Sequence, residues 1–106
     1  MKTNCKYRAI KTEVDGVWFA SKAEARHYSL LKAREERGEI THLILQPAWP
    51  IVINGKKVCT YKADFSYREN GNLRVIDVKG MLTPVYRLKK KLVESMYPGT
   101  TIEEVR

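Results

Sequence analysis

Two aspartates and a lysine are expected to lie on the same face of one predicted β-hairpin. Asn70-Gly71 separates two runs of alternating apolar residues, and this dipeptide favours a tight hairpin because both residues tolerate the positive φ angles of a type I′ turn. Counting outward from the turn places Asp64 directly opposite Asp77. Lys79 follows two residues later and lies on the same face, since side chains alternate along a strand. The three ionisable groups are therefore expected to meet.

The other face of this hairpin is predicted to be apolar. Its members alternate with the ionisable residues and are Ala63, Phe65, Tyr67, Ile76 and Val78. One face is therefore expected to join the core and the other to carry chemistry.

The opposed aspartates have no stabilising role in a sheet. Opposed Cβ atoms lie about 5 Å apart, and two carboxylates at that distance repel by about 3 kcal/mol at an effective dielectric constant of about 20. A divalent cation would remove the repulsion, because Mg²⁺ is held by one or two carboxylates together with substrate phosphate. Lys79 would then hold a phosphate or orient an attacking water. The alternative is a solvated hairpin in which the aspartates pair with Lys62, Arg68 and Lys79.

The pattern resembles a known nuclease signature. Asp64, followed after the hairpin by Asp77-Val78-Lys79, is similar to the PD-(D/E)xK motif, although Ala63 stands where that motif has proline and the second acid is aspartate. The opening NCKYRAIKTEVDGVWFASKAEAR (4–26) resembles a family of small phage-type proteins of unknown function placed in that superfamily. The order of parts is similar to phage junction-resolving endonucleases of the endonuclease I type.

The resemblance implies a restriction-endonuclease-like core and metal-assisted hydrolysis of DNA, with Mg²⁺ or Mn²⁺ as cofactor and a 5′-phosphate as product. It implies the catalytic residues Glu24, Asp64, Asp77 and Lys79, and the metal ligands Asp64, Asp77, Val78 through its carbonyl, and Glu24. Glu24 has a second interpretation from the sequence. It is the third residue after Ser21 in a capping box and would accept a hydrogen bond from the Ser21 amide without any catalytic role.

The remaining segments predict one mixed α/β (α+β) domain over residues 1–106, a small sheet of hairpins flanked by two helices. Besides the central hairpin, the expected strand segments are Tyr7 to Phe19 about Asp15-Gly16, Ile40 to Pro47, Trp49 to Ile53 with Lys56 to Thr60 about Asn54-Gly55, and Thr101 to Val105. The Lys56 to Thr60 strand would run on into the strand that carries Asp64. We expect these strands and the central hairpin about Asn70-Gly71 to form one mixed or antiparallel sheet.

Two helices are predicted from their end signals. The first begins at Ser21, ends near Arg37 before Gly38, and would bury Ala20, Ala23, Tyr28, Leu30 and Leu31. The second begins at Thr83-Pro84, ends at Tyr97, and would turn Val85, Leu88, Leu92 and Met96 toward the sheet.

The charge balance favours a polyanionic partner. The chain has 106 residues, a net charge of +8 and a pI near 9.6, which is typical of a nucleic-acid-binding protein. The expected DNA contacts are Lys22, Arg26, Arg87, Lys89, Lys90 and Lys91, and the alternative is a solvated basic face. No apolar run is long enough to span a bilayer and no signal peptide is evident, so we expect a cytoplasmic protein, in the host cytosol if phage-encoded.

Four further residues receive no catalytic role. Cys5 and Cys59 lack metal or disulfide spacing and are expected to be reduced, with Cys59 half-buried in a strand. His27 and His42 are expected to be surface or structural residues. The residues before Tyr7 are expected to be disordered or to form an arm.

The preferred function is cleavage of branched DNA of the Holliday-junction type by a homodimer, because junction resolution needs paired cuts and so short a chain lacks a base-reading domain. Two alternatives stay open. One is a nuclease for phage replication, packaging or host-DNA breakdown without junction selectivity. The other is a non-catalytic DNA-binding module with the nuclease fold; RNA also stays open as a substrate.

Overall fold

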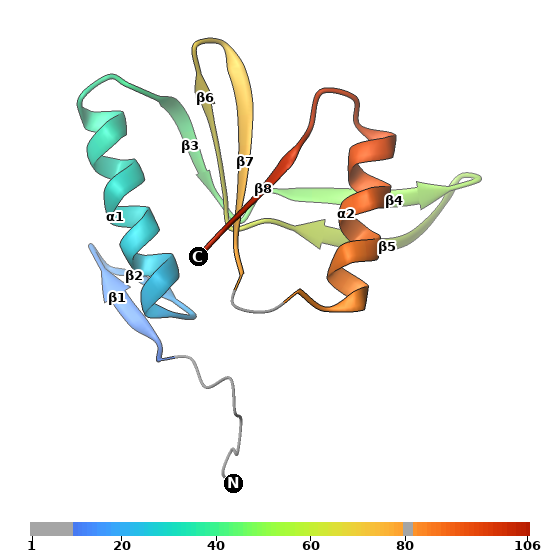
Figure 1. Cartoon of the computed structure of the whole chain (residues 1–106), viewed down its shortest axis with the longest axis horizontal. Helices are drawn as coiled ribbons and strands as arrows, with labels where there is room; N and C mark the ends of the chain where they lie inside the picture. Colours follow the sequence, from blue (N-terminus) through green and yellow to red (C-terminus); the bar gives the residue numbers. More distant parts are fainter. Residues whose placement is uncertain (1–9, 80–81) are drawn as a thin grey trace, which may run out of the picture.

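The computed structural model describes residues 10–79 and 82–106, and these residues confirm the mixed α/β class. The elements are β1 (Thr12–Val14), β2 (Val17–Phe19), α1 (Lys22–Glu36), β3 (Thr41–Leu45), β4 (Ala48–Ile53), β5 (Lys56–Lys62), β6 (Phe65–Glu69), β7 (Asn72–Val78), α2 (Pro84–Met96) and β8 (Ile102–Val105) (Figure 1). The expectations for Cys5, for the residues before Tyr7 and for the first residues of the opening hairpin lie outside the described residues.

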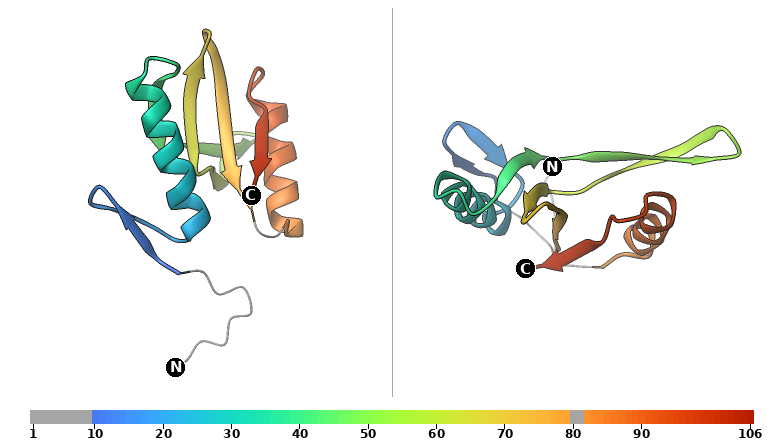
Figure 2. Two further views of the ribbon diagram at one scale, coloured as in Figure 1. Left: turned by 60° about the vertical axis from the view of Figure 1, so that its left-hand side comes forward. Right: turned by 90° about the horizontal axis from the view of Figure 1, so that it is seen from above.

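The central sheet has the strand order β3-β6-β7-β8, with β8 parallel to β7 and the other pairs antiparallel. The β4–β5 pair forms its own two-stranded ribbon, so the prediction of one sheet for both hairpins is wrong. The ribbon continues the β3–β6 ladder through backbone bonds from Gln46 to Asp64 and from Ala63 to Pro47, both 3.0 Å. The ladder bends there because Gln46 adopts a left-handed φ of 52°, and the ribbon projects from the body (Figures 1 and 2).

The sheet is covered on both faces. In Figure 2, α1 with the β1–β2 hairpin lies on one side, and α2 with the ribbon lies on the other. One buried cluster joins Phe65, Tyr67 and Ile76 to α1, whereas a second joins Val75 and Ala63 to α2 and the ribbon. The prediction that one hairpin face lies outside the core is therefore wrong, and Ala63 lies in the other cluster from the one expected because the chain bends beside it.

The three predicted hairpin turns are confirmed. Asp15-Gly16, Asn54-Gly55 and Asn70-Gly71 each have positive φ at both residues, as a type I′ turn requires. The last turn sets the β6–β7 register, in which Phe65 lies opposite Ile76. The paired register ends at Phe65 and Ile76. Beyond it, the Asp64 amide donates to the carbonyl of Ile76 at 3.1 Å and the Val78 amide donates to the Asp64 side chain at 2.7 Å, so Asp64 lies beside the end of β7 that carries Asp77.

The helix ends are where the sequence predicts them, but the buried faces differ. Ser21 and Thr83 cap α1 and α2 through their side-chain oxygens. In α1, Leu30 is exposed and Ala25 is buried with Tyr28 and Leu31, and Ala20, which precedes the helix, is also exposed.

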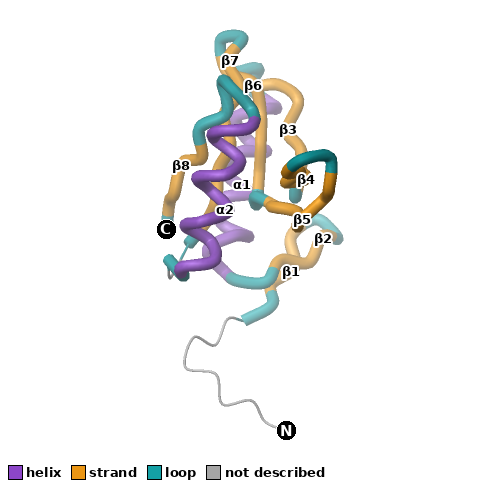
Figure 3. The backbone as a smooth tube through the Cα atoms, turned by 90° about the vertical axis from the view of Figure 1, so that its right-hand side faces the viewer, coloured by secondary structure: helices purple, strands orange, loops and turns teal. Residues whose placement is uncertain are grey.

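The buried face of α2 is rotated from the predicted one. Val85 and Leu88 are 62% and 58% exposed, whereas Tyr86 and Val93 are buried. The reason is that α2 lies over the ribbon and beside β8 rather than flat on the sheet (Figure 3), so that the Tyr86 hydroxyl reaches Glu104 of β8 at 2.9 Å. Leu92 and Met96 are partly buried against the same cluster, as expected.

Candidate functional site

The root of the β6–β7 hairpin, the end away from its turn, brings Asp77 into a buried setting. Asp77 lies on a central strand and is 1% exposed. The Tyr61 hydroxyl donates to its Oδ2, and the Lys79 ammonium lies 3.3 Å from its Oδ1. Burial raises the pKa of Asp77 to about 6, with the neighbouring Asp64 adding to the rise and Tyr61 and Lys79 opposing it. This carboxylate is thus held in place but poorly solvated.

Asp64 is the second member of the pair and is held by the backbone of the facing strand. Its Oδ2 accepts a 2.7 Å hydrogen bond from the Val78 amide. Burial raises the pKa of Asp64, the nearby Glu24 carboxylate raises it further, and the hydrogen bond from Val78 lowers it. Two carboxylates with raised pKa values therefore share one end of the sheet.

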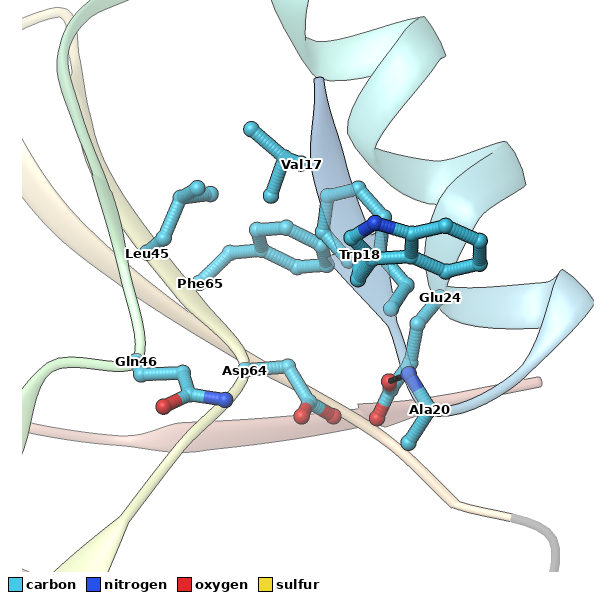
Figure 4. Close-up of a pocket in the computed structure, with 9 residues that line it drawn as sticks. Val17, Trp18, Ala20, Glu24, Leu45, Gln46, Asp64 and Phe65 are labelled. Atoms are coloured by element: carbon cyan, nitrogen blue, oxygen red, sulfur yellow. Dashed lines mark hydrogen bonds between the residues drawn. The ribbon is translucent and has the colours of Figure 1, made fainter. Parts of the chain in front are cut away.

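Glu24 faces this pair from the first turn of α1. A pocket of about 300 Å³ is lined by Glu24, Asp64 and Gln46, with the exposed Trp18 at its rim. Figure 4 shows the carboxylates of Glu24 and Asp64 directed toward each other, with the Gln46 amide on the other side of Asp64. The pocket is the concave surface on which two carboxylates and one amide group, from three separate segments of the chain, come together.

The capping prediction for Glu24 is partly wrong. The Ser21 hydroxyl accepts from the Glu24 amide at 3.1 Å as expected, but the Glu24 carboxylate accepts from the Ala20 amide, also at 3.1 Å, and not from Ser21. That bond uses Oε1 and leaves Oε2 without a hydrogen-bond partner among the described residues. One carboxylate can therefore cap the helix entry and still present an oxygen to the pocket.

The donor set suits a cation that takes few protein ligands. Within residues 10–79 and 82–106, no group of three or more acidic, histidine or cysteine side chains has the spacing to enclose a metal. Asp64 and Asp77 supply carboxylate oxygens at one place, and the resemblance implies the Val78 carbonyl as a further ligand. This fits Mg²⁺ or Mn²⁺, which are commonly held by one or two carboxylates while water and substrate phosphate complete the coordination.

The basic residues predicted to bind DNA are distributed over several surfaces. Lys22 and Arg26 lie exposed on α1, and Arg87 and Lys91 lie exposed on α2. Lys90 pairs with Glu104 at 3.0 Å, whereas Lys89 lines a depression that also contains Lys79. The six residues thus do not form one cluster. Of them, Lys89 lies beside Lys79, the lysine that pairs with Asp77.

The solvated-hairpin alternative is not what the structure contains. Lys79 is the only one of the three proposed cations that pairs with an aspartate in the described part of the chain, and Asp77 is buried. Arg68 instead donates to the Gly71 carbonyl at 3.5 Å.

Two site residues were not predicted from the sequence. Tyr61 orients Asp77, and strand alternation across the ribbon could not place it because the ladder bends at Ala63. Gln46 lines the pocket in a left-handed backbone conformation that is uncommon for a residue other than glycine. The Gln46-Pro47 dipeptide indicated a break in the strand, which is confirmed, but it carried no signal of a site. Cys59 is half-buried in β5 with a free thiol, as expected.

The fold and site define a small mixed α/β protein with a buried carboxylate pair beside a lysine at the root of a hairpin. Residues 4–105 match the family described as "Protein of unknown function (DUF1064)", and the chain belongs to this family. No curated protein matches the sequence at a significant level. Among the described helices, neither α1 nor α2 has the length and apolar character needed to cross a bilayer.

Proposed function

We propose that this protein is a divalent-metal-dependent DNA endonuclease of the PD-(D/E)xK type. The observation that carries the proposal is the adjacent pair Asp64 and Asp77, with Lys79 at 3.3 Å from Asp77. Two like charges held together at one end of a sheet oppose folding, and carboxylates with raised pKa values are typical of a functional site. Asp64 lines the pocket of Glu24, and Asp77 lies buried beside it. A cation that binds both carboxylates would remove the repulsion.

The residues that would hold the metal are Asp64, Asp77 and the Val78 carbonyl, with Glu24 contributing its free oxygen directly or through water. When bound, Mg²⁺ or Mn²⁺ supplies charge stabilisation at the phosphate and lowers the pKa of water. Tyr61 keeps Asp77 in position through its hydroxyl. The Val78 amide does the same for Asp64.

Lys79 would contact the scissile phosphate. Its ammonium lies beside Asp77 and 4.3 Å above the centre of the Tyr86 ring, so its position is fixed from two sides. An ammonium held in this way donates hydrogen bonds to a non-bridging phosphate oxygen and stabilises the negative charge that grows there during in-line attack.

The proposed substrate is branched DNA, cut by a homodimer. Residues 10–79 and 82–106 form two helices and small sheets around the site, without a separate base-reading domain. Phosphate contacts from a basic surface position a protein without reading sequence, which favours selection by DNA shape. Two copies would supply the paired cuts that junction resolution requires.

The test is cleavage of end-labelled four-way junction, linear duplex and single strand, with Mg²⁺, Mn²⁺ or EDTA. Wild type is compared with Asp77→Ala, and Asp15→Asn serves as the control because it removes one carboxylate from an exposed turn residue whose positive φ asparagine tolerates. We expect metal-dependent paired cuts at the junction, lost in Asp77→Ala and kept in the control.

The other outcomes separate the alternatives. Equal cutting of every DNA substrate would keep the endonuclease and discard junction selectivity, in favour of a role in replication, packaging or host-DNA breakdown. Cutting of RNA in place of DNA would change the substrate class. Tight DNA binding with no cutting under any condition would instead assign a non-catalytic module, and full activity in Asp77→Ala would refute the proposed site.

A further inference from the structure

A second depression lies beside the root of the β6–β7 hairpin, on the α2 side. It has a volume of about 370 Å³ and brings together Lys62 of β5, Lys79 after β7 and Lys89 of α2. The hairpin root lies between the first turns of α1 and α2 (Figure 1), so the acidic pocket with Glu24 and this lysine-lined depression flank it. Lys79 links the depression to the carboxylate pair, because it lines the depression and also pairs with Asp77.

The depression carries an excess of positive charge. In the described part of the chain, no carboxylate lies within 4 Å of the Lys62 or Lys89 ammonium, and Asp77 is the single acidic partner of Lys79. Lys89 donates instead to the Thr60 carbonyl at 3.3 Å, which holds its stem against β5. Three cations with one shared anion repel each other unless a further anion binds between them.

The neighbouring lysine of α2 makes a useful contrast. Lys90 follows Lys89 in the sequence but points to β8, where Glu104 neutralises it at 3.0 Å. Lys62 and Lys89 converge on the depression without such a partner.

The floor of the depression suits the backbone of a nucleic-acid strand. Tyr61 and Tyr86 line it with ring centroids 6.3 Å apart, and Val85 is exposed at its edge. Both rings are themselves buried, so the exposed carbon at the depression is Val85, and the lysine ammonium groups beside it are the groups available to phosphate.

We propose that this depression binds the phosphate next to the scissile one, with Lys62 and Lys89 as its contacts. The inference rests on the proposed nuclease function and deepens it by giving the strand a path. The strand enters beside α2, passes its adjacent phosphate over Lys62 and Lys89, and presents the next phosphate to Lys79 and the carboxylate pair. Lys62 was not among the expected DNA contacts, and Arg87, Lys90 and Lys91 lie outside this path.

The experiment measures DNA binding by fluorescence anisotropy in EDTA over a series of NaCl concentrations. Each lost phosphate contact lowers the slope of log affinity against log salt by about one. Because Lys62 and Lys89 are proposed to hold one phosphate, Lys62→Met with Lys89→Met should lower the slope by about one. The matched control is Lys56→Met with Lys57→Met, which removes the same charge from the exposed tip of the same ribbon. We expect a much smaller change in the control.

The outcomes are decisive in both directions. An unchanged slope in the Lys62/Lys89 variant, or an equal fall in the control, would overturn the proposal, because either result reports only general attraction. If the double variant does not fold, Lys62→Met alone tests the same point, since Lys62 is exposed; the slope should then fall by less than about one, because Lys89 still contacts the phosphate. EDTA removes catalysis from the readout, so the slope can fall even if no metal-dependent cleavage is found.

Discussion

The two ends of the β6–β7 hairpin differ in how their charged side chains are paired. At the turn end, Arg34, Glu69, Arg74 and Glu103 alternate in sign. Arg74 is held by Glu69 at 2.7 Å and by both oxygens of Glu103. At the root end, the carboxylates of Asp64 and Asp77 are adjacent, and one lysine stands against them.

The difference shows that this fold can pair opposite charges, as it does at the turn end. The turn-end network has two cations and two anions, and the carboxylate of Glu103 has a lowered pKa because Arg74 binds it. The root-end aspartates have raised pKa values because of burial. We infer that the root end is arranged for a ligand that the turn end does not need.

The largest expected effect separates the two ends by activity. Lys79→Met should reduce cleavage about a thousandfold, because it removes the donor that stabilises charge on the phosphate. Arg74→Met removes a cation from the turn end of the same strand and should leave the rate per folded molecule unchanged. Single-turnover cleavage of labelled junction DNA measures both. Equal losses in the two variants would remove the distinction between the ends.

The second prediction concerns stability in EDTA. The pKa of Asp77 is about 6 in the folded protein against an ordinary 3.8, so ionisation opposes folding and the penalty grows as pH rises through this interval. Asp77→Asn should therefore be more stable than wild type above about pH 7, by at most about 3 kcal/mol, and should lose this gain near pH 4. Urea unfolding across this pH range measures it, with Asp15→Asn as the exposed control.

A pH-independent difference between Asp77→Asn and wild type would contradict the raised pKa. It would mean that the substitution acts through the Tyr61 hydrogen bond or through packing.

The third prediction compares two residues that have the same strained backbone conformation. Gln46 and His42 both have left-handed φ angles, 52° and 55°, at the two ends of β3. Glycine should relieve about 1 kcal/mol at either position. Gln46→Gly should nevertheless lower cleavage about tenfold, because it removes a pocket amide, whereas His42→Gly should not. Parallel melting and cleavage assays test this, and equal activity in both variants would leave Gln46 without a role.

The smallest effect is expected at the turn end itself. Arg74→Met leaves Glu69 and Glu103 without their shared cation and should lower the free energy of unfolding by about 1 kcal/mol, since the network is half-exposed. The loss should shrink in high salt because screening weakens such pairs. A loss several times larger that is insensitive to salt would show that Arg74 acts through packing.

The hairpin root could be predicted from the sequence because local rules determine it. Asn70-Gly71 fixes the turn, the turn fixes the register as far as Phe65 and Ile76, and this register brings the neighbouring Asp64 and Asp77 to the same end of the hairpin. The helix caps at Ser21 and Thr83 follow from equally local chemistry.

What could not be predicted depends on tertiary packing. The bend at Gln46 turns the ribbon out of the sheet, and this brings Tyr61 against Asp77 and Lys62 toward Lys89. Because α2 packs over this ribbon and not flat on the sheet, Val85 and Leu88 are exposed and Tyr86 is buried. The alternation of residues along a strand does not predict in which direction the strand bends. The contact of Tyr61 with Asp77 and the position of Lys62 at the same depression as Lys89 could therefore not be predicted.

Metal binding without DNA tests the central claim most directly. Free Mn²⁺ is measured by electron paramagnetic resonance during titration of wild type, Asp77→Asn and Glu69→Gln, which removes one carboxylate charge from the root and from the turn end respectively. We predict that wild type and Glu69→Gln take up Mn²⁺ at one site and that Asp77→Asn does not. Equal uptake by Asp77→Asn and wild type would contradict the account, because the opposed aspartates would then not be the metal site.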